Sequence, residues 1–222
     1  MRVQFDEQLQ ELKTNLIRMG SLCEKSILTS CQALQLKMPN LTNTNKEIYQ
    51  EVKQLRMKTE SLCMQIILQQ QPVAKDLRQV SASLKIVTDL ERITEQNVDI
   101  HRIVSFLNEE TLTGYEKIVE MSQSVVQMVS ESVNAYAKQN VVIANKVIID
   151  DDIVDNKFKE IKKDLIQVIA QNPERGEYAL DLFMIAKYFE GMADHAVHIA
   201  KWVKFSVNGY KISDIEQVEV FV

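Results

Sequence analysis

Apolar residues recur along most of this chain at steps of three and four positions, a spacing that places them on one face of an α-helix. Between positions 86 and 104 the recurring positions are Ile86, Leu90, Ile93, Asn97, Ile100 and Val104. Between positions 185 and 203 the same steps recur at Ile185, Phe189, Met192, Ala196, Ile199 and Val203. Such a narrow stripe is typical of helices that pack antiparallel in a bundle, so the pattern predicts an all-α fold.

Interruptions of the pattern divide the chain into six predicted helices. The interruptions fall at Pro39-Asn40, Gln71-Pro72, residues 108–114, residues 150–152 (three aspartates), Asn172-Pro173 and Asn208-Gly209. Proline excludes the residue before it from the helical conformation, and glycine commonly follows the last turn of a helix. The β-branched stretch VVIANKVII at 141–149 also fits a short strand. A helix is favoured there, because a single strand would have no partner.

An internal duplication with a period of about 100 residues relates the two halves of the chain. LERITEQNVDIHRIV in the first half matches FEGMADHAVHIAKWV in the second, and QQQP matches AQNP. The duplication predicts two repeated antiparallel three-helix bundles packed side by side, since each alone would bury its apolar stripes poorly. The predicted units are residues 1–108 and 109–208, followed by a tail at 209–222.

Composition narrows the classes of function. The 222 residues are 45% hydrophobic and carry a formal net charge of −5, with an isoelectric point near 5.4. An acidic chain lacks the basic face that a nucleic-acid binder needs. Three cysteines without CxxC spacing favour a reducing compartment, and neither a signal peptide nor a membrane span is evident. We therefore expect a cytoplasmic protein without membrane insertion, and peripheral association with a membrane stays open.

Two rows of ligand-type side chains accompany the duplication. Each row has the spacing i, i+4, i+8 along one helix: Glu91, Glu95 and Asp99 in the first half, and Glu190, Asp194 and His198 in the second. Like charges at this spacing repel, so each row calls for a counter-charge or a bound cation. Carboxylates with imidazole suit iron, zinc or manganese, and oxygen ligands alone suit magnesium, calcium or manganese. A solvated acidic face without metal is the alternative.

The remaining candidate residues do not indicate an enzyme. His195 is predicted to be a packed or capped histidine rather than a ligand, and His101 is predicted to lie near the surface. No nucleophile elbow, glycine-rich phosphate loop or kinase signature occurs. The Glu-x-x-His pairs of carboxylate-bridged di-iron bundles are also absent.

Four stretches together resemble the PhoU family. They are FDEQLQELKTNLIRMGSLCEKSI, SLCMQIILQQQPVAKDLRQV, LERITEQNVDI and FEGMADHAVHIA, and they cover both halves in the family's order. The resemblance implies a pair of three-helix bundles that usually dimerises. It also implies a negative regulator of the phosphate-starvation response, which links the ATPase of the phosphate ABC transporter to a phosphate-sensing histidine kinase. Some members bind iron or other metals through paired acid-x-x-x-Asp motifs.

Carried over to this chain, the resemblance implies one intact metal site and one altered site. The second-half motif is complete, with Glu190 and Asp194 on one helix and Asp151 and Asp155 on its neighbour. In the first half Glu91 and Glu95 are present. The positions opposite them, where the family usually has Asp-x-x-x-Asn, are Tyr49 and Lys53. Lys53 would supply a positive charge in place of a metal, so metal is expected mainly in the second half.

Three functions compete at this point. The first is a non-enzymatic regulator of phosphate uptake and signalling. The second is a metal-binding or storage bundle, whose ion could be iron, zinc, manganese or magnesium. The third is a PhoU-like accessory protein of a transporter for another ion, because a fold alone does not fix a function.

Overall fold

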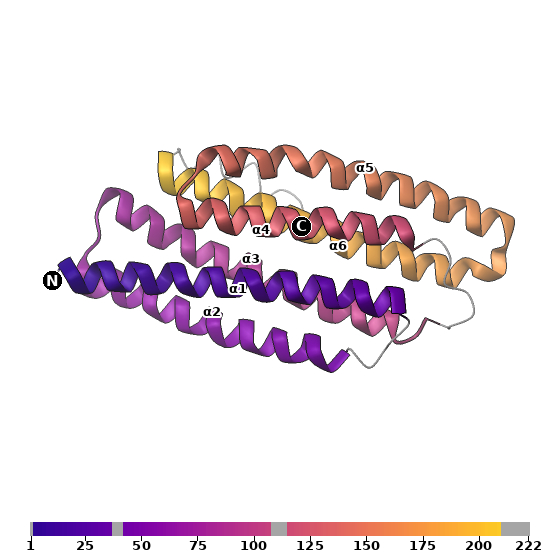
Figure 1. Cartoon of the computed structure of the whole chain (residues 1–222), viewed down its shortest axis with the longest axis horizontal. Coiled ribbons are helices and arrows are strands. Elements are labelled where there is room, and N and C mark those ends of the chain that lie inside the picture. The colour runs from indigo at the N-terminus through magenta and orange to yellow at the C-terminus, as the bar shows by residue number, and fades with distance from the viewer. Residues whose placement is uncertain (1, 37–41, 108–114, 210–222) are drawn as a thin grey trace.

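Six long α-helices make up the described part of the chain in the computed structural model, which describes residues 2–36, 42–107 and 115–209. They are α1 (Arg2–Leu36), α2 (Thr42–Gln70), α3 (Ala74–Val104), α4 (Glu116–Lys138), α5 (Val141–Gln171) and α6 (Gly176–Asn208), with a short 3₁₀ turn, η3 (Pro173–Arg175), before the last helix. The described residues contain no strand, which confirms the all-α prediction. Figure 1 shows the helix axes running along the long dimension of the molecule, with α1–α3 on one side and α4–α6 on the other.

The six helices form two three-helix bundles that pack side by side, as predicted. In the first bundle α2 packs on α1 and α3, and in the second α5 packs on α4 and α6. The bundles meet through two helix pairs, α1 with α4 and α3 with α6. Consequently α1, α3, α4 and α6 are inner helices, whereas α2 and α5 cover the outside.

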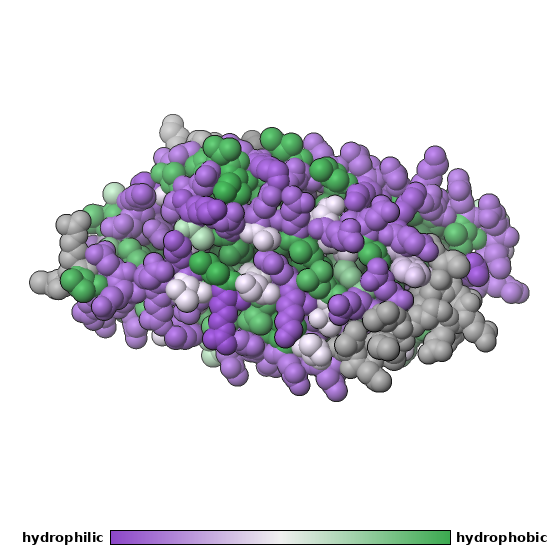
Figure 2. All heavy atoms as spheres, in the orientation of Figure 1, coloured by the Kyte–Doolittle hydropathy of each residue, from purple (hydrophilic) through white to green (hydrophobic). Residues whose placement is uncertain are grey.

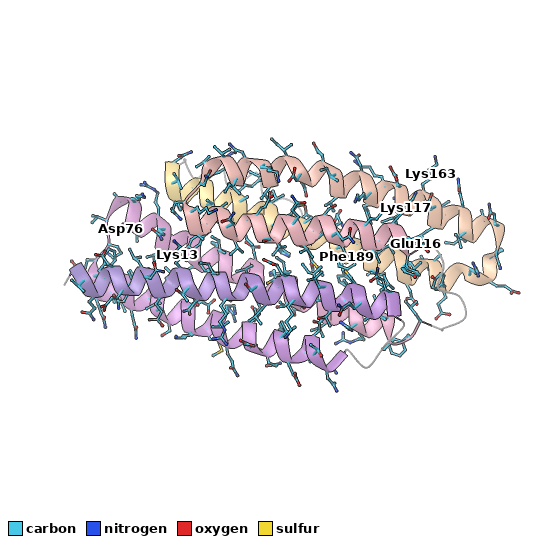
Figure 3. The ribbon with its side chains drawn as sticks, in the orientation of Figure 1. Lys13, Asp76, Glu116, Lys117, Lys163 and Phe189 are labelled. Atoms are coloured by element: carbon cyan, nitrogen blue, oxygen red, sulfur yellow. The ribbon has the colours of Figure 1, made fainter. Side chains whose placement is uncertain are left out.

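One apolar core runs through both bundles and includes side chains from all six helices. The twelve stripe positions predicted between 86 and 104 and between 185 and 203 are all buried. Figure 3 places Phe189 among the helices and Lys163 on the outer helix α5, and Phe189 is 1% exposed. The two halves therefore share one core.

The polar member of the first stripe, Asn97, belongs to a buried hydrogen-bond network. Its Nδ2 donates to the Ile93 carbonyl oxygen at 2.8 Å, and its Oδ1 accepts from Ser30 Oγ at 2.7 Å. Asn45 continues the network, because its Nδ2 donates to Ser30 Oγ at 3.0 Å and its Oδ1 accepts from Ser26 Oγ at 3.1 Å. These bonds join α1, α2 and α3 and satisfy polar groups that would be costly to bury alone.

Most predicted interruptions within the described ranges coincide with helix ends. The α2 helix ends at Gln70, two residues before Pro72, and α5 ends at Gln171, before Asn172. The α6 helix ends at Asn208 and is capped by Gly209, whose φ of 70° is left-handed. The predicted interruptions at Pro39-Asn40 and at 108–114 lie outside the described ranges, and so does the predicted tail beyond residue 209.

The predicted break at residues 150–152 is wrong. The fourth helix ends instead at Lys138, and the next residue, Gln139, has a left-handed φ of 49°. Asn140 then caps α5, its Oδ1 accepting from the backbone N–H groups of Val142 and Ile143 at 2.9 and 3.2 Å. The three aspartates lie inside α5, which is possible because an N-cap decides where a helix starts, whereas adjacent carboxylates on different faces do not stop one. The helical interpretation of 141–149 is confirmed.

The face shown in Figure 2 is covered mainly by hydrophilic side chains, with apolar ones scattered among them. None of the helices, within the residues that the structure describes, contains a stretch long and apolar enough to cross a bilayer.

Candidate functional site

The second-half motif forms a group of neighbouring carboxylates between α5 and α6, here called the carboxylate site: Asp151, Asp155, Glu190 and Asp194. Partial burial, together with the negative charges of Asp194, Asp155, Asp152 and Glu190, raises the pKa of Asp151 to about 6. Both causes disfavour the charged form of a carboxyl group, and the second requires other anions near Asp151. The structure therefore brings together the four residues that the sequence selected.

One lysine partly balances the carboxylate site. Lys187 forms an ion pair with Glu190, one turn along the same helix, and its ammonium also lies 5.6 Å from the centre of the Phe158 ring. The surplus of negative charge and the oxygen donors fit a hard divalent cation. The oxygen atoms are not preassembled, however, since no three of these carboxylates bring ligand atoms within 4.8 Å of one another.

The first-half row has a different electrostatic balance. Burial raises the pKa of Tyr49, and Glu95 and Glu91 raise it further, so Tyr49 faces the row as predicted. The cation next to Glu91 is Arg56, whose Nε lies 2.8 Å from Glu91 Oε2. Lys53, the cation expected from the sequence, is exposed. Arg56 lies one helical turn further along α2 and also pairs with Glu60 at 2.7 Å.

The third member of each row turns away from the first two. Four residues advance an α-helix by slightly more than one turn, so a row at i, i+4, i+8 drifts by about 40° at each step. After two steps His198 reaches the contact between α6 and α3, where its Nδ1 lies 3.7 Å from Asp89 Oδ1. His195 faces the same carboxylate, with Nδ1 2.9 Å from Asp89 Oδ1.

The duplication predicts an equivalent contact in which the third member of the α3 row lies beside a residue of α6. Asp99, the counterpart of His198, lies near Tyr188, the counterpart of Asp89. Burial raises the pKa of Tyr188, and the charge of Asp99 raises it further, so the two side chains lie within electrostatic range of each other. Asp99 is also paired with Arg102 at 2.8 Å. Only the contact of Asp89 with His195 and His198 combines a carboxylate with imidazoles.

Sequence reasoning missed Asp89, because this residue has no acidic counterpart in the second half and lies outside the i, i+4 rows. His195 has the packed, hydrogen-bonded environment that was predicted, but its partner is on another helix. The prediction that His101 is superficial is wrong. The residue is fully buried, and no described residue hydrogen bonds to either ring nitrogen. Burial lowers the pKa of His101 to about 4.

Comparison with known proteins agrees with this architecture. The sequence model of the PhoU domain matches residues 16–104 and 118–203. A protein of Clostridium acetobutylicum named phosphate-specific transport system accessory protein PhoU homolog is 30% identical over 210 residues, which cover 94% of this chain and 96% of the relative. A homologue of the same name from Pseudomonas aeruginosa is 28% identical over 214 residues, covering 96% of this chain and 88% of the relative.

Solved structures give the same result. The crystal structure of PhoU from Pseudomonas aeruginosa superposes with a TM-score of 0.88 at 28% identity, covering 93% of this chain and all of the other. The structure of the phosphate transport system regulatory protein PhoU from Streptococcus pneumoniae gives a TM-score of 0.85 at 20% identity, covering 93% of this chain and 98% of the other. The second likeness supports the fold alone.

Proposed function

Because this chain belongs to the PhoU family, we propose that it is an accessory protein of phosphate transport that restrains phosphate uptake and phosphate-starvation signalling. The observation that carries the proposal is the match of both halves to the family and the nearly full-length similarity to relatives named for the phosphate-specific transport system. In this proposal the chain works in the cytoplasm, as a homodimer. It contacts the ATPase of the phosphate ABC transporter and a phosphate-sensing histidine kinase.

The proposed activity is one of binding and requires no chemical step. Helical bundles of this kind offer long outer surfaces, here α2 and α5, and an inner framework that keeps those surfaces in register. A regulator of this type acts by preferring one state of its partner, and the difference in affinity for the two states sets the size of its effect.

We further propose that the carboxylate site binds a metal ion that contributes to this role. Asp151, Asp155, Glu190 and Asp194 would supply oxygen ligands, and the raised pKa of Asp151 indicates that a nearby cation would be favourable. Iron, zinc, manganese and magnesium are candidates. The first-half residues Glu91, Glu95 and Asp99 would bind metal less well, because Arg56 and Arg102 already pair with two of them.

Deletion of the chromosomal copy tests the regulatory role. In phosphate-rich medium the deletion strain should show raised expression of a phosphate-starvation reporter and raised uptake of radiolabelled phosphate, and the wild-type copy supplied on a plasmid should reverse both. Reporter expression and uptake that stay at wild-type levels, in a strain that lacks any related copy, would rule out this role.

Elemental analysis separates this proposal from a metal-storage role. A storage bundle would contain many metal ions per chain and leave the phosphate reporter unaffected by deletion. A regulator would contain at most a few ions per chain, and the reporter would respond. Uptake assays with other ions in the same strains distinguish a phosphate transporter from a transporter of another ion.

A further inference from the structure

A second group of ligand-type side chains lies at the contact between α3 and α6, apart from the carboxylate site. Asp89 comes from the first bundle, and His195 and His198 come from the second. Each can offer one atom such that all three atoms lie within 4.8 Å of one another, and no other set of three acidic, histidine or cysteine residues in the described ranges meets this spacing. The three side chains are mostly enclosed, with 13%, 15% and 33% of their surfaces exposed.

The separations agree with ligation of one ion. Protein nitrogen and oxygen atoms bind zinc at about 2.0–2.2 Å, so two ligands of one tetrahedral or octahedral ion lie about 3.0–3.5 Å apart. The distances from Asp89 Oδ1 to Nδ1 of His195 and of His198 are 2.9 and 3.7 Å, on either side of that range. The two rings also meet edge to face, with centroids 5.9 Å apart. Small side-chain rotations would bring all three atoms onto one ion.

The charge of Asp89 has no fixed counter-ion. Burial by itself would raise the pKa of this carboxyl, but the hydrogen-bonded imidazole of His195 and the nearby imidazole of His198 lower it below its usual value. Within the described residues, no lysine or arginine forms an ion pair with Asp89. Lys85, one turn earlier on α3, instead lies 5.8 Å from the centre of the Trp202 ring. A largely buried carboxylate needs a cationic partner, which either an imidazolium or a metal ion can supply.

We propose that Asp89, His195 and His198 form a binding site for a single divalent transition-metal ion that connects the two bundles. Two imidazole nitrogens and one carboxylate oxygen favour zinc or ferrous iron over magnesium, which prefers oxygen ligands alone. Three protein ligands leave at least one coordination position for water or another small ligand, and the exposed edge of His198 gives solvent access to it. This site is distinct from the carboxylate site and goes beyond the proposed regulatory function.

The duplicated fold supplies a matched control. Asp99 and Tyr188 are the residues equivalent to His198 and Asp89, and they include no imidazole. Arg102 also pairs with Asp99 at 2.8 Å. A cation that binds to Asp89, His195 and His198 should therefore not bind to Asp99 and Tyr188. Asp99→Asn tests any general effect of removing one carboxylate from the contact between α3 and α6.

Cobalt is a suitable probe, because Co²⁺ ligated by protein side chains gives visible absorption bands that report its coordination. The full chain, freed of metal by chelation, would be titrated with Co²⁺ and then with Zn²⁺ as a competitor. We expect one equivalent of Co²⁺ to give the bands and Zn²⁺ to remove them. Zn²⁺ should also raise the melting temperature, since a ligand that binds only the folded state stabilises it.

Variants assign the signal to its ligands. Asp89→Asn, His195→Gln and His198→Gln should each weaken Co²⁺ binding by roughly tenfold or more. Asp99→Asn and the double variant Asp155→Asn with Asp194→Asn should keep the Co²⁺ bands. Should Asp89→Asn fail to fold, His198→Gln decides the outcome, because His198 is the most exposed of the three ligands.

Two results would overturn the proposal. One is the absence of Co²⁺ bands in the wild-type chain, which would leave Asp89 as a polar bridge between helices. The other is loss of the bands in the Asp155→Asn, Asp194→Asn variant with retention in His198→Gln, which would assign the ion to the carboxylate site instead.

Discussion

Arg56 approaches Glu91 with its Nε atom 2.8 Å from Oε2, and this ion pair makes the two acidic rows unequal. In the second half Lys187 pairs with Glu190 alone among the four carboxylates, and Asp151 keeps a raised pKa. In the first half arginines pair with two members of the row, Glu91 and Asp99. A metal ion that binds the first row must compete with a cation that is covalently part of the protein. Coulomb repulsion between that cation and the metal opposes binding there.

We therefore expect most of the metal bound to acidic side chains to lie at the carboxylate site, and little at the first-half row. Asp155→Ala with Asp194→Ala should reduce the metal bound there by roughly tenfold or more, because it removes two of four oxygen ligands. Glu91→Ala with Glu95→Ala should leave the metal content unchanged. Elemental analysis of the purified variants measures both, and equal losses from the two pairs would contradict the asymmetry.

Arg56→Gln offers the reverse test. Removing the guanidinium leaves Glu91 without its ion-pair partner, so the first row should gain affinity for Mn²⁺ in calorimetric titration. The matched control is Lys53→Gln, which removes the exposed lysine that the sequence had suggested. An equal gain in both variants would show that Arg56 has no special role.

Asp151 should make the metal-free protein more stable at mildly acidic pH. Its pKa is about 6 when folded, against a usual value of 3.8, so the folded state takes up a proton before the unfolded state does. The penalty from this group is complete above about pH 6 and disappears as the pH falls through 6 toward 3.8. After allowance for solvent screening, Asp151→Asn should raise the melting temperature at pH 7.5 by about 2–4 °C, corresponding to ~1 kcal/mol.

The measurement is thermal unfolding of both proteins in chelator at pH 7.5 and pH 4.5. The advantage of Asp151→Asn should shrink at the lower pH. An advantage of the same size at both pH values would mean that the carboxylate repulsion does not act on stability.

His101 should have the opposite effect on acid stability. Its pKa is about 4 when folded and 6.5 in its usual state, so below pH 6.5 the unfolded chain takes up a proton that the folded chain does not. The stability associated with the neutral ring is complete above pH 6.5 and is lost as the pH falls toward 4. His101→Leu should remove about 1–2 kcal/mol of the loss in unfolding free energy between pH 7 and pH 5.

Urea unfolding of His101→Leu and of the wild type at the two pH values checks this. Since Asp151 is the same in both proteins, its contribution cancels in the comparison. Identical pH dependence in the two proteins would show that His101 is not protonated differently on unfolding.

Gly20 should be required for the contact between α1 and α4. A Cβ atom at position 20 would lie 2.8 and 2.9 Å from the two γ-carbons of Val133, closer than real contacts allow. The β-branched valine has little rotational freedom in a helix, so the helices must move apart. Gly20→Ala should destabilise the protein by about 1–3 kcal/mol, partly offset by the better helix propensity of alanine.

A double-mutant cycle with Val133→Ala checks this mechanism. Val133→Ala removes both γ-carbons, so Gly20→Ala should cost less in that background than in the wild type. An equal cost in the two backgrounds would locate the effect of Gly20 elsewhere.

The periodic stripes illustrate what sequence alone could provide. Helical spacing is a local property, and burial of the stripe follows from it because the apolar face of a helix must pack against something. The duplication could also be read directly, since matched stretches such as those around Glu91 and Glu190 occur in the same order in both halves. The one wrong break came from weighting three aspartates above the cap at Asn140, a local signal that was present in the chain.

The sequence by itself thus determined six helices in two repeats and their buried faces, and the family resemblance selected the four carboxylates of the proposed site. Only the tertiary structure decided which cation pairs with the first acidic row and which carboxylate lies against the two histidines. Arg56 reaches Glu91 from another helix, and Asp89 meets His195 and His198 across 106 residues or more of chain. These contacts depend on how far each helix is rotated about its own axis where it packs. The spacing of residues along one helix does not determine the rotation of the neighbouring helix.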